Sequence, residues 1–169
     1  MTLVGVAARA LPELCVVVLL LQACRPPATT SDTLESGDSP PQASAIVTIT
    51  NQERKTAGLS PLRETPLLRH AAQLQATQMA HVGRIDHVLA SEPHPRPEDR
   101  LAAAGYQWQA WAENLAFGFD PAGVVAGWMA SPGHRANILN PTYTETGVGF
   151  ALDRSGRRYY AQVFGRPRR

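Results

Sequence analysis

The sequence predicts a layered α+β domain with about four helices and a small antiparallel sheet. Three observations support this fold class: 44% of the 169 residues are hydrophobic, helix-start signals recur along the central segments, and the last third contains two segments rich in β-branched and aromatic residues. A chain of this length has room for one ordinary domain with a packed core. Helices and sheet are expected to bury their apolar sides against one another.

Two helices are predicted in the first half of the domain. The first covers residues 46–57, where apolar and polar side chains share the segment and Gly58 offers a C-terminal stop. The second runs from Pro66 to about His81, because Thr65 provides an N-cap hydroxyl and a proline fits the first helical turn. Its apolar face has a period of three to four residues and comprises Leu67, Leu68, Ala71, Leu74, Gln75 and Met79.

Two shorter helices follow. Residues 97–99 (Pro-Glu-Asp) begin the third, with acids favourably placed against the helix dipole, and Gly105 ends it. Residues 120–121 (Asp-Pro) begin the fourth, and Pro132 is expected to close it. The predicted buried stripe of the fourth helix comprises Val124, Val125, Trp128 and Met129.

Strands are predicted near the end of the chain. Residues 147–153 and 157–164 read as a hairpin around residues 154–156 (Arg-Ser-Gly), in which the glycine supplies a positive φ. Residues 113–117 are expected to add a third strand.

The N-terminal part has the composition of an export signal followed by a tether. The apolar run 16–21 is too short to span a bilayer and suits the signal of residues 1–24. Residues 21–24 (Leu-Gln-Ala-Cys) resemble a lipobox, so Cys24 is the expected lipidation site and membrane anchor; cleavage near Ala23 without lipid is the alternative, because Gln22 is unusual there. Residues 25–44 are rich in Pro, Ser and Thr and predict a disordered tether, with the folded domain in residues 45–169.

The charges and cysteines narrow the range of partners. The positive charge is almost entirely arginine, and no zinc-finger spacing, basic helix or aromatic stacking pattern accompanies it, so nucleic acid is not an expected partner. Cys15 and Cys24 both precede the domain, which therefore contains no disulfide and depends on its core for stability.

Several short motifs occur in a fixed order between residues 46 and 165. They are 51–54 (Asn-Gln-Glu-Arg), 78–80 (Gln-Met-Ala) leading to His87, Arg100 with 105–106 (Gly-Tyr), 112–116 (Ala-Glu-Asn-Leu-Ala), 128–139 (Trp-Met-Ala-Ser-Pro-Gly-His-Arg-Ala-Asn-Ile-Leu), 147–149 (Gly-Val-Gly) and 160–165 (Tyr-Ala-Gln-Val-Phe-Gly). The ordered set resembles the CAP superfamily, which contains cysteine-rich secretory proteins, insect venom antigens and plant pathogenesis-related proteins. The likeness is greatest to its bacterial SCP-like extracellular branch.

The resemblance implies a three-layer α-β-α sandwich with a cleft that gathers two histidines and two acids. Three of these would be His87, Glu113 and His134. Animal members carry a glutamate where this chain has Ser131, so the full set is not present, and Glu145 is the candidate to approach the cleft instead. The complete expected ligand-binding cleft comprises His87, Glu113, Asn114, Ser131, His134 and Glu145.

Three functions for this cleft remain open from the sequence. His87 and His134 could bind Zn²⁺ weakly, with Glu113 beside them, and the same three residues are the catalytic candidates of a metal-assisted peptidase or esterase. A binding module for an envelope glycan, lipid or protein is slightly preferred, because no nucleophile motif is present. In a purely structural interpretation, Glu113 and Asn114 bond to the backbone of the approach to the fourth helix, and His134, in a loop, caps residues 136–139. Each case predicts an exported protein that is either lipid-anchored in the cell envelope or secreted.

Overall fold

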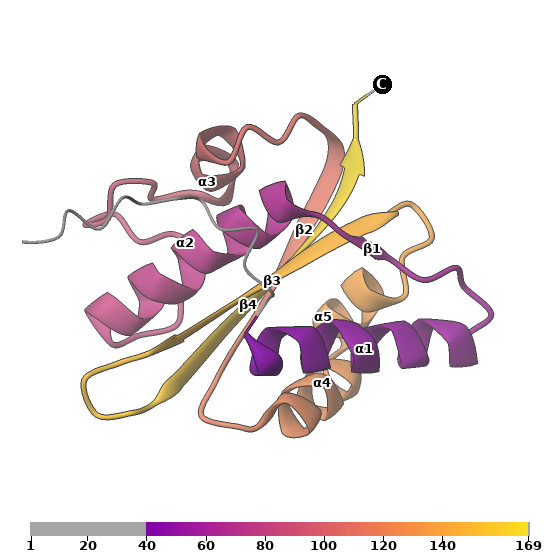
Figure 1. Cartoon of the computed structure of the whole chain (residues 1–169), viewed down its shortest axis with the longest axis horizontal. Helices are drawn as coiled ribbons and strands as arrows, with labels where there is room; N and C mark the ends of the chain where they lie inside the picture. Colours follow the sequence, from indigo (N-terminus) through magenta and orange to yellow (C-terminus); the bar gives the residue numbers. More distant parts are fainter. Residues whose placement is uncertain (1–39, 169) are drawn as a thin grey trace, which may run out of the picture. The chain divides into compact units, whose positions relative to one another are not determined.

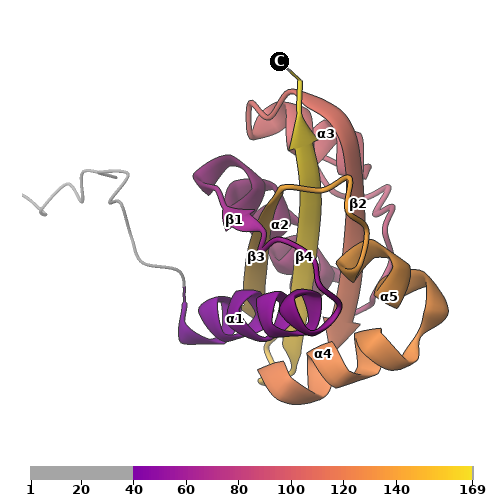
Figure 2. The same ribbon diagram turned by 90° about the vertical axis from the view of Figure 1, so that its right-hand side faces the viewer.

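A four-stranded sheet forms the middle layer of the domain, and helices cover both of its faces (Figure 1, Figure 2). The computed structural model describes residues 40–168, so the predicted signal, Cys24 and most of the tether lie outside the described residues. The elements are α1 (Pro41–Thr56), β1 (Arg63–Glu64), α2 (Pro66–Val82), α3 (Pro97–Ala103), β2 (Trp108–Phe117), α4 (Pro121–Ala130), α5 (Pro132–Ile138), β3 (Glu145–Leu152) and β4 (Arg158–Pro167). The predicted α+β class and three-layer arrangement are confirmed.

The sheet has the strand order β1-β3-β4-β2, which leaves β2 at one edge. β3 and β4 form the predicted antiparallel hairpin, and β2 pairs antiparallel with β4, so that Glu113 lies opposite Val163. The short strand β1 was not predicted and pairs in parallel with β3. In the hairpin turn, Asp153 accepts hydrogen bonds from the backbone of Ser155 and Arg157, and Gly156 has the expected positive φ of 79°.

Alternation along the strands divides the core into two parts. On one face, Ala161 and Val163 of β4 pack against buried residues of α2 and α3 such as Leu68 and Leu101. On the other face, Phe164 packs with residues of α1, α4 and α5, among them Ile46, Val124, Trp128 and Ile138. Figure 2 shows β4 in the middle, with α2 and α3 on one side of the sheet and α1, α4 and α5 on the other.

Helix α2 packs directly on the backbone of β3 at two glycines. A Cβ added at Gly147 would lie 2.6 Å from the Cα of Arg69 and closer still to the neighbouring backbone atoms. A Cβ at Gly149 would lie 2.5 Å from the backbone nitrogen of Gln73 and closer still to Ala72, whereas ordinary contacts of a Cβ lie at 3.4–4 Å. The glycines therefore set the spacing between this helix and the sheet.

The predicted helix starts are confirmed at α2 and α4. The side chains of Thr65 and Asp120 accept hydrogen bonds from the backbone of Leu68 and Gly123, respectively. All five helices in the described part of the chain begin at a proline, which suits the first turn because its missing N–H would have no acceptor there. Within residues 40–168, no helix is both long and apolar enough to cross a bilayer.

Four details differ from the sequence-based expectations. Helix α1 starts at Pro41 and buries Ala43, so residues 41–44 belong to a helix and not to the tether. Pro132 follows the end of α4, as expected, and also begins a fifth helix, α5. His134 therefore lies in a helix and not in a loop. Leu67 is 46% exposed, on the outer side of α2, and Met129 is only partly buried at the margin of the core.

Candidate functional site

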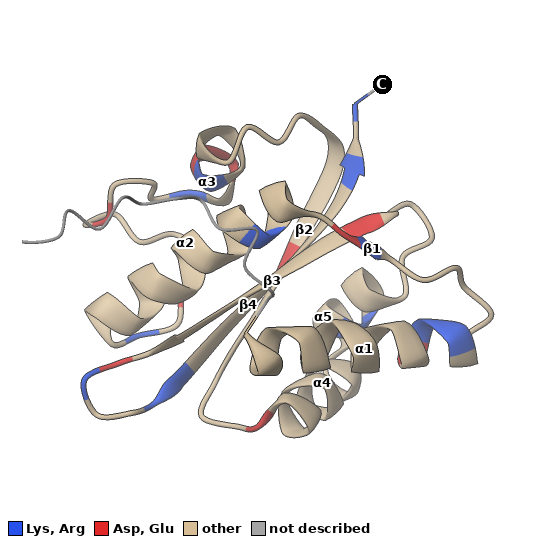
Figure 3. Cartoon of the chain, viewed as in Figure 1, with Lys and Arg blue, Asp and Glu red and all other residues tan. Residues whose placement is uncertain are grey.

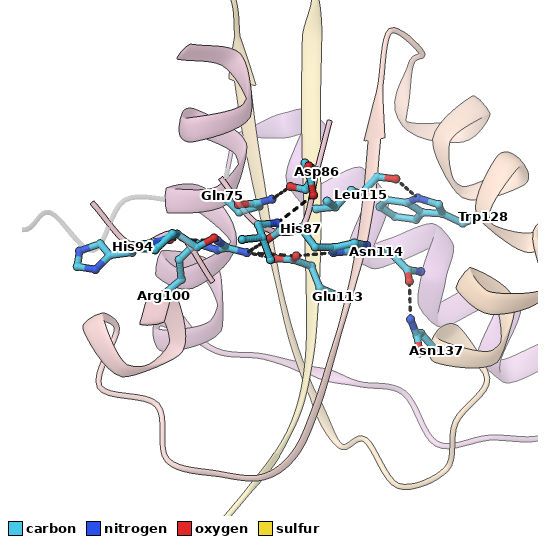
Figure 4. A network of polar contacts seen from close by, with 12 residues as sticks. Gln75, Asp86, His87, His94, Arg100, Glu113, Asn114, Leu115, Trp128 and Asn137 are labelled. Carbon is cyan, nitrogen blue, oxygen red and sulfur yellow. Dashed lines mark hydrogen bonds and ion pairs between the residues drawn. The ribbon is translucent and has the colours of Figure 1, made fainter. Parts of the chain in front are cut away.

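The site is built around two neighbouring residues of the edge strand β2. Glu113 and Asn114 are both buried, and the alternation of the strand directs their side chains to opposite faces of the sheet. Figure 4 shows the group of His87, Arg100 and Glu113 on one side of the strand, with Asn114 and Asn137 joined on the other. Most charged residues of the domain lie in turns and near the ends of helices and strands (Figure 3), and Glu113, within a strand, is an exception. Its carboxylate is buried and therefore requires a partner, because an unpaired buried charge is costly.

The carboxylate of Glu113 is held by two partners. Its Oε1 lies 2.8 Å from Nδ1 of His87, and Nη2 of Arg100 donates to Oε1 and Oε2 at 3.3 and 3.2 Å. The Arg100 and Glu113 side chains are only 1% and 2% exposed. Both carboxylate oxygens are thus occupied by donors within the domain.

His87 is presented to solvent by this buried pair. It follows α2 in an irregular segment, and its side chain remains 52% exposed. A carboxylate only accepts, so Nδ1 carries the proton of the hydrogen bond and Nε2 is left for an external group. The hydrogen bond to Glu113 raises the pKa of His87, and this effect outweighs the partial burial of the ring, which acts in the opposite direction.

Asn114 anchors α5 on the opposite face of β2. Its Nδ2 donates to the backbone oxygen of His134 at 3.1 Å, and its Oδ1 accepts from Nδ2 of Asn137 at 2.8 Å. Since Asn114 is completely buried, these bonds fix the start of α5 against the edge strand. Asn114 therefore positions the backbone of His134 in α5. The structural interpretation had expected Glu113 and Asn114 to bond to the backbone before α4, and Glu113 instead bonds to the side chains of His87 and Arg100.

The imidazole of His134 lies within electrostatic range of His87. Burial lowers the pKa of His134, and the positive charge of His87 lowers it further. The two rings come from segments on opposite sides of β2, the irregular segment after α2 and the first turn of α5. The structure thus relates His87, Glu113 and His134 through one edge strand, although they are far apart in the sequence.

The two other expected cleft residues have separate surroundings. Ser131 joins α4 to α5: its backbone N–H donates to Trp128 and its backbone oxygen accepts from Arg135, while its side chain caps neither helix. Glu145 starts β3, accepts a hydrogen bond from the Tyr106 hydroxyl at 2.9 Å, and forms an ion pair with Arg63. Strand β4 lies between β3 and β2, which separates Glu145 from the Glu113 network.

The side chains near His87 do not fit a closed zinc site. Among residues 40–168, no group of three or more His, Cys, Asp and Glu side chains is arranged to hold a metal ion. The Glu113 carboxylate already accepts hydrogen bonds from His87 and Arg100, which leaves only the two imidazoles as metal ligands. Structural zinc sites use four protein ligands and catalytic sites three. Weak zinc binding by His87 and His134 alone stays a prediction.

Arg100 is the part of the site whose role the sequence analysis missed. It lies on the inward side of α3, beside the buried residues Leu101 and Ala104. An arginine at such a position almost always has a carboxylate or carbonyl partner, and this is the signal that could have identified it. The sequence alone did not show which acid would be its partner.

A hollow of the domain lies apart from His87 and His134. It has a volume of about 580 Å³ and is lined by the last turns of α2, including Thr77 and His81, and by the β3–β4 turn, including Asp153 and Ser155. Neither His87 nor His134 lines it, so the two imidazoles are not part of this hollow.

Comparison with known proteins gives consistent results. The chain matches the model of the cysteine-rich secretory protein family, CAP, over residues 47–164. It is 35% identical over 149 residues to the uncharacterized protein YkwD of Bacillus subtilis (strain 168), which covers 85% of this chain and 56% of YkwD. The chain thus spans about half the length of that relative.

Two solved structures show the same fold. An extracellular protein containing an SCP domain from Bacillus anthracis str. Ames has a TM-score of 0.67 and 28% identity, with 78% of this chain and 45% of that protein covered. An outer surface protein from Borrelia burgdorferi also has a TM-score of 0.67, at 21% identity, with 74% and 92% covered. The family match covers most of the folded part, and both the order of the motifs and the three-layer fold agree with it. The chain therefore belongs to the CAP family.

Proposed function

We propose that this chain is an exported binding module that recognises an envelope or extracellular ligand through the surface around His87 and His134. The observation that supports this proposal is the arrangement on β2, where the adjacent residues Glu113 and Asn114 each hold one histidine-bearing segment. Glu113 thus contacts the ring of one histidine and Asn114 the backbone of the other, and both histidines remain at least partly accessible.

The cost of this arrangement supports a functional role. A buried ion pair such as Arg100 and Glu113 is often no more stabilising than apolar residues of similar volume, because both charges lose their hydration. Here the pair orients a ring that is half-exposed and contributes little to the core. Orientation of an exposed imidazole is useful when that imidazole binds a ligand or transfers a proton.

The chemistry of His87 indicates what such a ligand offers. When protonated, its ring directs an Nε2–H donor outward, and when neutral it directs an acceptor outward. Phosphates, carboxylates and carbonyls of an envelope glycan, lipid or protein would all accept from the protonated form. The raised pKa of His87 extends the pH range over which that donor is present.

Export and tethering belong to the same proposal. The B. anthracis relative is described as extracellular and the B. burgdorferi relative as an outer surface protein, which supports an extracytoplasmic location. The signal-like residues 1–24 and the lipobox-like residues 21–24 add membrane attachment through Cys24. Growth with a labelled fatty acid should mark the wild-type chain and leave Cys24→Ser unlabelled; an unlabelled wild type would show that the chain is not lipidated.

The binding proposal is tested by retention on envelope material. Protein carrying Cys24→Ser, which removes the predicted lipid acceptor, is offered to isolated bacterial cell wall and to phosphatidylglycerol vesicles. We expect retention on one of them, and loss of retention when His87→Ala and His134→Ala are added. His70→Ala, at an exposed position of α2, is the matched control and should bind normally. Failure of the starting protein to bind either material contradicts the proposal.

A hydrolase is the second candidate, favoured by one contact. A histidine whose Nδ1 donates to a buried carboxylate has the orientation of a general base, with Nε2 free to take a proton from water. In this case His87 is the base and Glu113 its orienting partner. Peptidoglycan, casein and ester substrates should then be turned over by the wild type and not by His87→Ala. The absence of turnover, or equal turnover by the variant, would exclude this role for His87.

A further inference from the structure

We infer that Arg100 is the positioning residue of the site and that it acts on His87 by two routes, through the Glu113 carboxylate and through the backbone of the segment that carries His87. The inference rests on the proposed function in that it concerns the same surface. The effect of the buried Arg100 guanidinium on the orientation and tautomer of the His87 ring can be measured without any ligand.

The first route is the carboxylate. Arg100 donates to both oxygens of Glu113, and Glu113 in turn accepts from Nδ1 of His87. The two hydrogen bonds from Arg100 hold both carboxylate oxygens in place, which keeps Oε1 directed at Nδ1 of the ring. Without Arg100, the carboxylate would lose these hydrogen bonds, and no buried donor would hold Oε1 in the orientation that accepts from the ring.

The second route is the backbone between α2 and α3. Nη2 of Arg100 also donates to the backbone oxygen of His87 at 3.1 Å, and Nη1 donates to the backbone oxygens of His94 and Pro95 at 3.1 and 3.3 Å. The same guanidinium therefore binds both ends of residues 87–95. Leu89 anchors the middle of this segment, since it is fully buried and its N–H donates to Pro95.

The two routes require the shape of an arginine and not only its charge. The planar guanidinium carries donors on separate nitrogens: Nη2 reaches the Glu113 carboxylate and the His87 carbonyl, and Nη1 reaches the carbonyls at the other end of the segment. A lysine would supply one ammonium group at one point, and it cannot occupy both places. Arg100→Lys therefore preserves a positive charge near Glu113 and removes the simultaneous hold on the backbone.

Arg54 provides a matched control within the same domain. Its guanidinium is also buried, and it donates to the backbone oxygens of Ser60, Ile138, Asn140 and Tyr143, but to no carboxylate. It joins the end of α1 to the segment between α5 and β3. Arg54→Lys should therefore disturb the fold to a comparable extent without acting on His87.

The experiment uses the full chain labelled with ¹⁵N-histidine and compares the wild type with Arg100→Lys and Arg54→Lys by NMR. At a pH where the rings are neutral, the wild type should show His87 with its proton on Nδ1. In Arg100→Lys we expect that tautomer preference to be lost and the amide of Leu89 to exchange about tenfold faster, because its segment loses charge-assisted hydrogen bonds. Arg54→Lys should leave both signals as in the wild type. Unchanged His87 and Leu89 signals in Arg100→Lys, or equal changes in Arg54→Lys, would overturn the inference.

A second variant separates the two routes and remains informative if Arg100→Lys does not fold. Glu113→Gln retains the side-chain shape and leaves the three carbonyl contacts of Arg100 in place. It should weaken the Nδ1–H preference of His87, because an NH2 donor replaces one of the two acceptor oxygens, while the Leu89 amide keeps its protection; loss of both would refute the backbone route. If these signals change as expected but the wild type binds neither cell wall nor vesicles, the positioning role stands and the proposed function fails.

Discussion

Replacement of Gly149 by alanine tests the close contact between α2 and β3. The added Cβ would lie 2.5 Å from the backbone nitrogen of Gln73, whereas ordinary contacts of a Cβ begin at 3.4 Å. The atoms that it meets are helix backbone and cannot rotate away. Helix and strand must therefore separate locally by about 1 Å, a gap that forfeits roughly half of the dispersion attraction between packed atoms.

The size of the effect follows from what α2 buries. Leu68 and Met79 are fully buried in the core on this face, and each contributes about 1.5–3 kcal/mol by burial. Partial loss of these contacts, together with strain in the strand, gives an expected destabilisation of about 3 kcal/mol, near the upper end for overpacked cores. For a domain of this size, that loss lowers Tm by about 10 °C.

Thermal and urea unfolding, followed by circular dichroism, measure this loss. Gly127→Ala is the control, because a Cβ at that position of α4 meets no atom within 4 Å, and alanine favours a helix by up to about 1 kcal/mol. Gly127→Ala should leave Tm unchanged or raise it. A loss of less than about 1 kcal/mol for Gly149→Ala, or equal behaviour of the two variants, would refute the spacing argument.

Three further predictions concern single contacts. Because Glu113 raises the pKa of His87, their contact stabilises the fold below pH 6.5, and the gain is lost as the pH rises through the higher folded value. Urea unfolding of wild type and His87→Gln should differ more at about pH 5.5 than at about pH 8.5, and equal differences would contradict this. Asn114→Ala should cost about 1–3 kcal/mol in urea unfolding, since it leaves the His134 carbonyl and the Asn137 amide without their buried partner; a neutral effect would argue against α5 being anchored there. Asp120→Ala should cost about 1 kcal/mol of N-cap stabilisation, and Asp120→Asn should restore most of it in the same assay.

The sequence predicted those parts of the fold that depend on local chemistry. The start of α2 at Thr65 and Pro66 and the turn at Gly156 each require particular residue types, and both appear where expected. Helix α5 was missed because Pro132 is compatible both with the end of one helix and with the start of the next. The early start of α1 was missed for a related reason, since the Pro and Ser residues before Ile46 are also typical of a tether.

The candidate site depended on long-range contacts that no local pattern contains. His87, Glu113 and His134 were identified through a family resemblance, and the structure relates them only because β2 lies at a sheet edge between two connecting segments. The partners of Glu113 and Glu145 could not be predicted from the sequence for the same reason. Glu113 meets Arg100 and Glu145 meets Tyr106 through tertiary packing, which neither spacing nor residue type specifies.

The proline that begins each of the five helices in residues 40–168 bears on how a domain without cysteines stays folded. A proline whose fixed φ suits the native backbone narrows the conformations open to the denatured chain, which is worth about 0.4–1 kcal/mol at each position. Five such positions together are comparable to the contribution of a single disulfide, about 2–4 kcal/mol. Because residues 25–169 contain no thiol, this restraint is the same in reducing and oxidising surroundings, and folding needs no oxidant or disulfide isomerase.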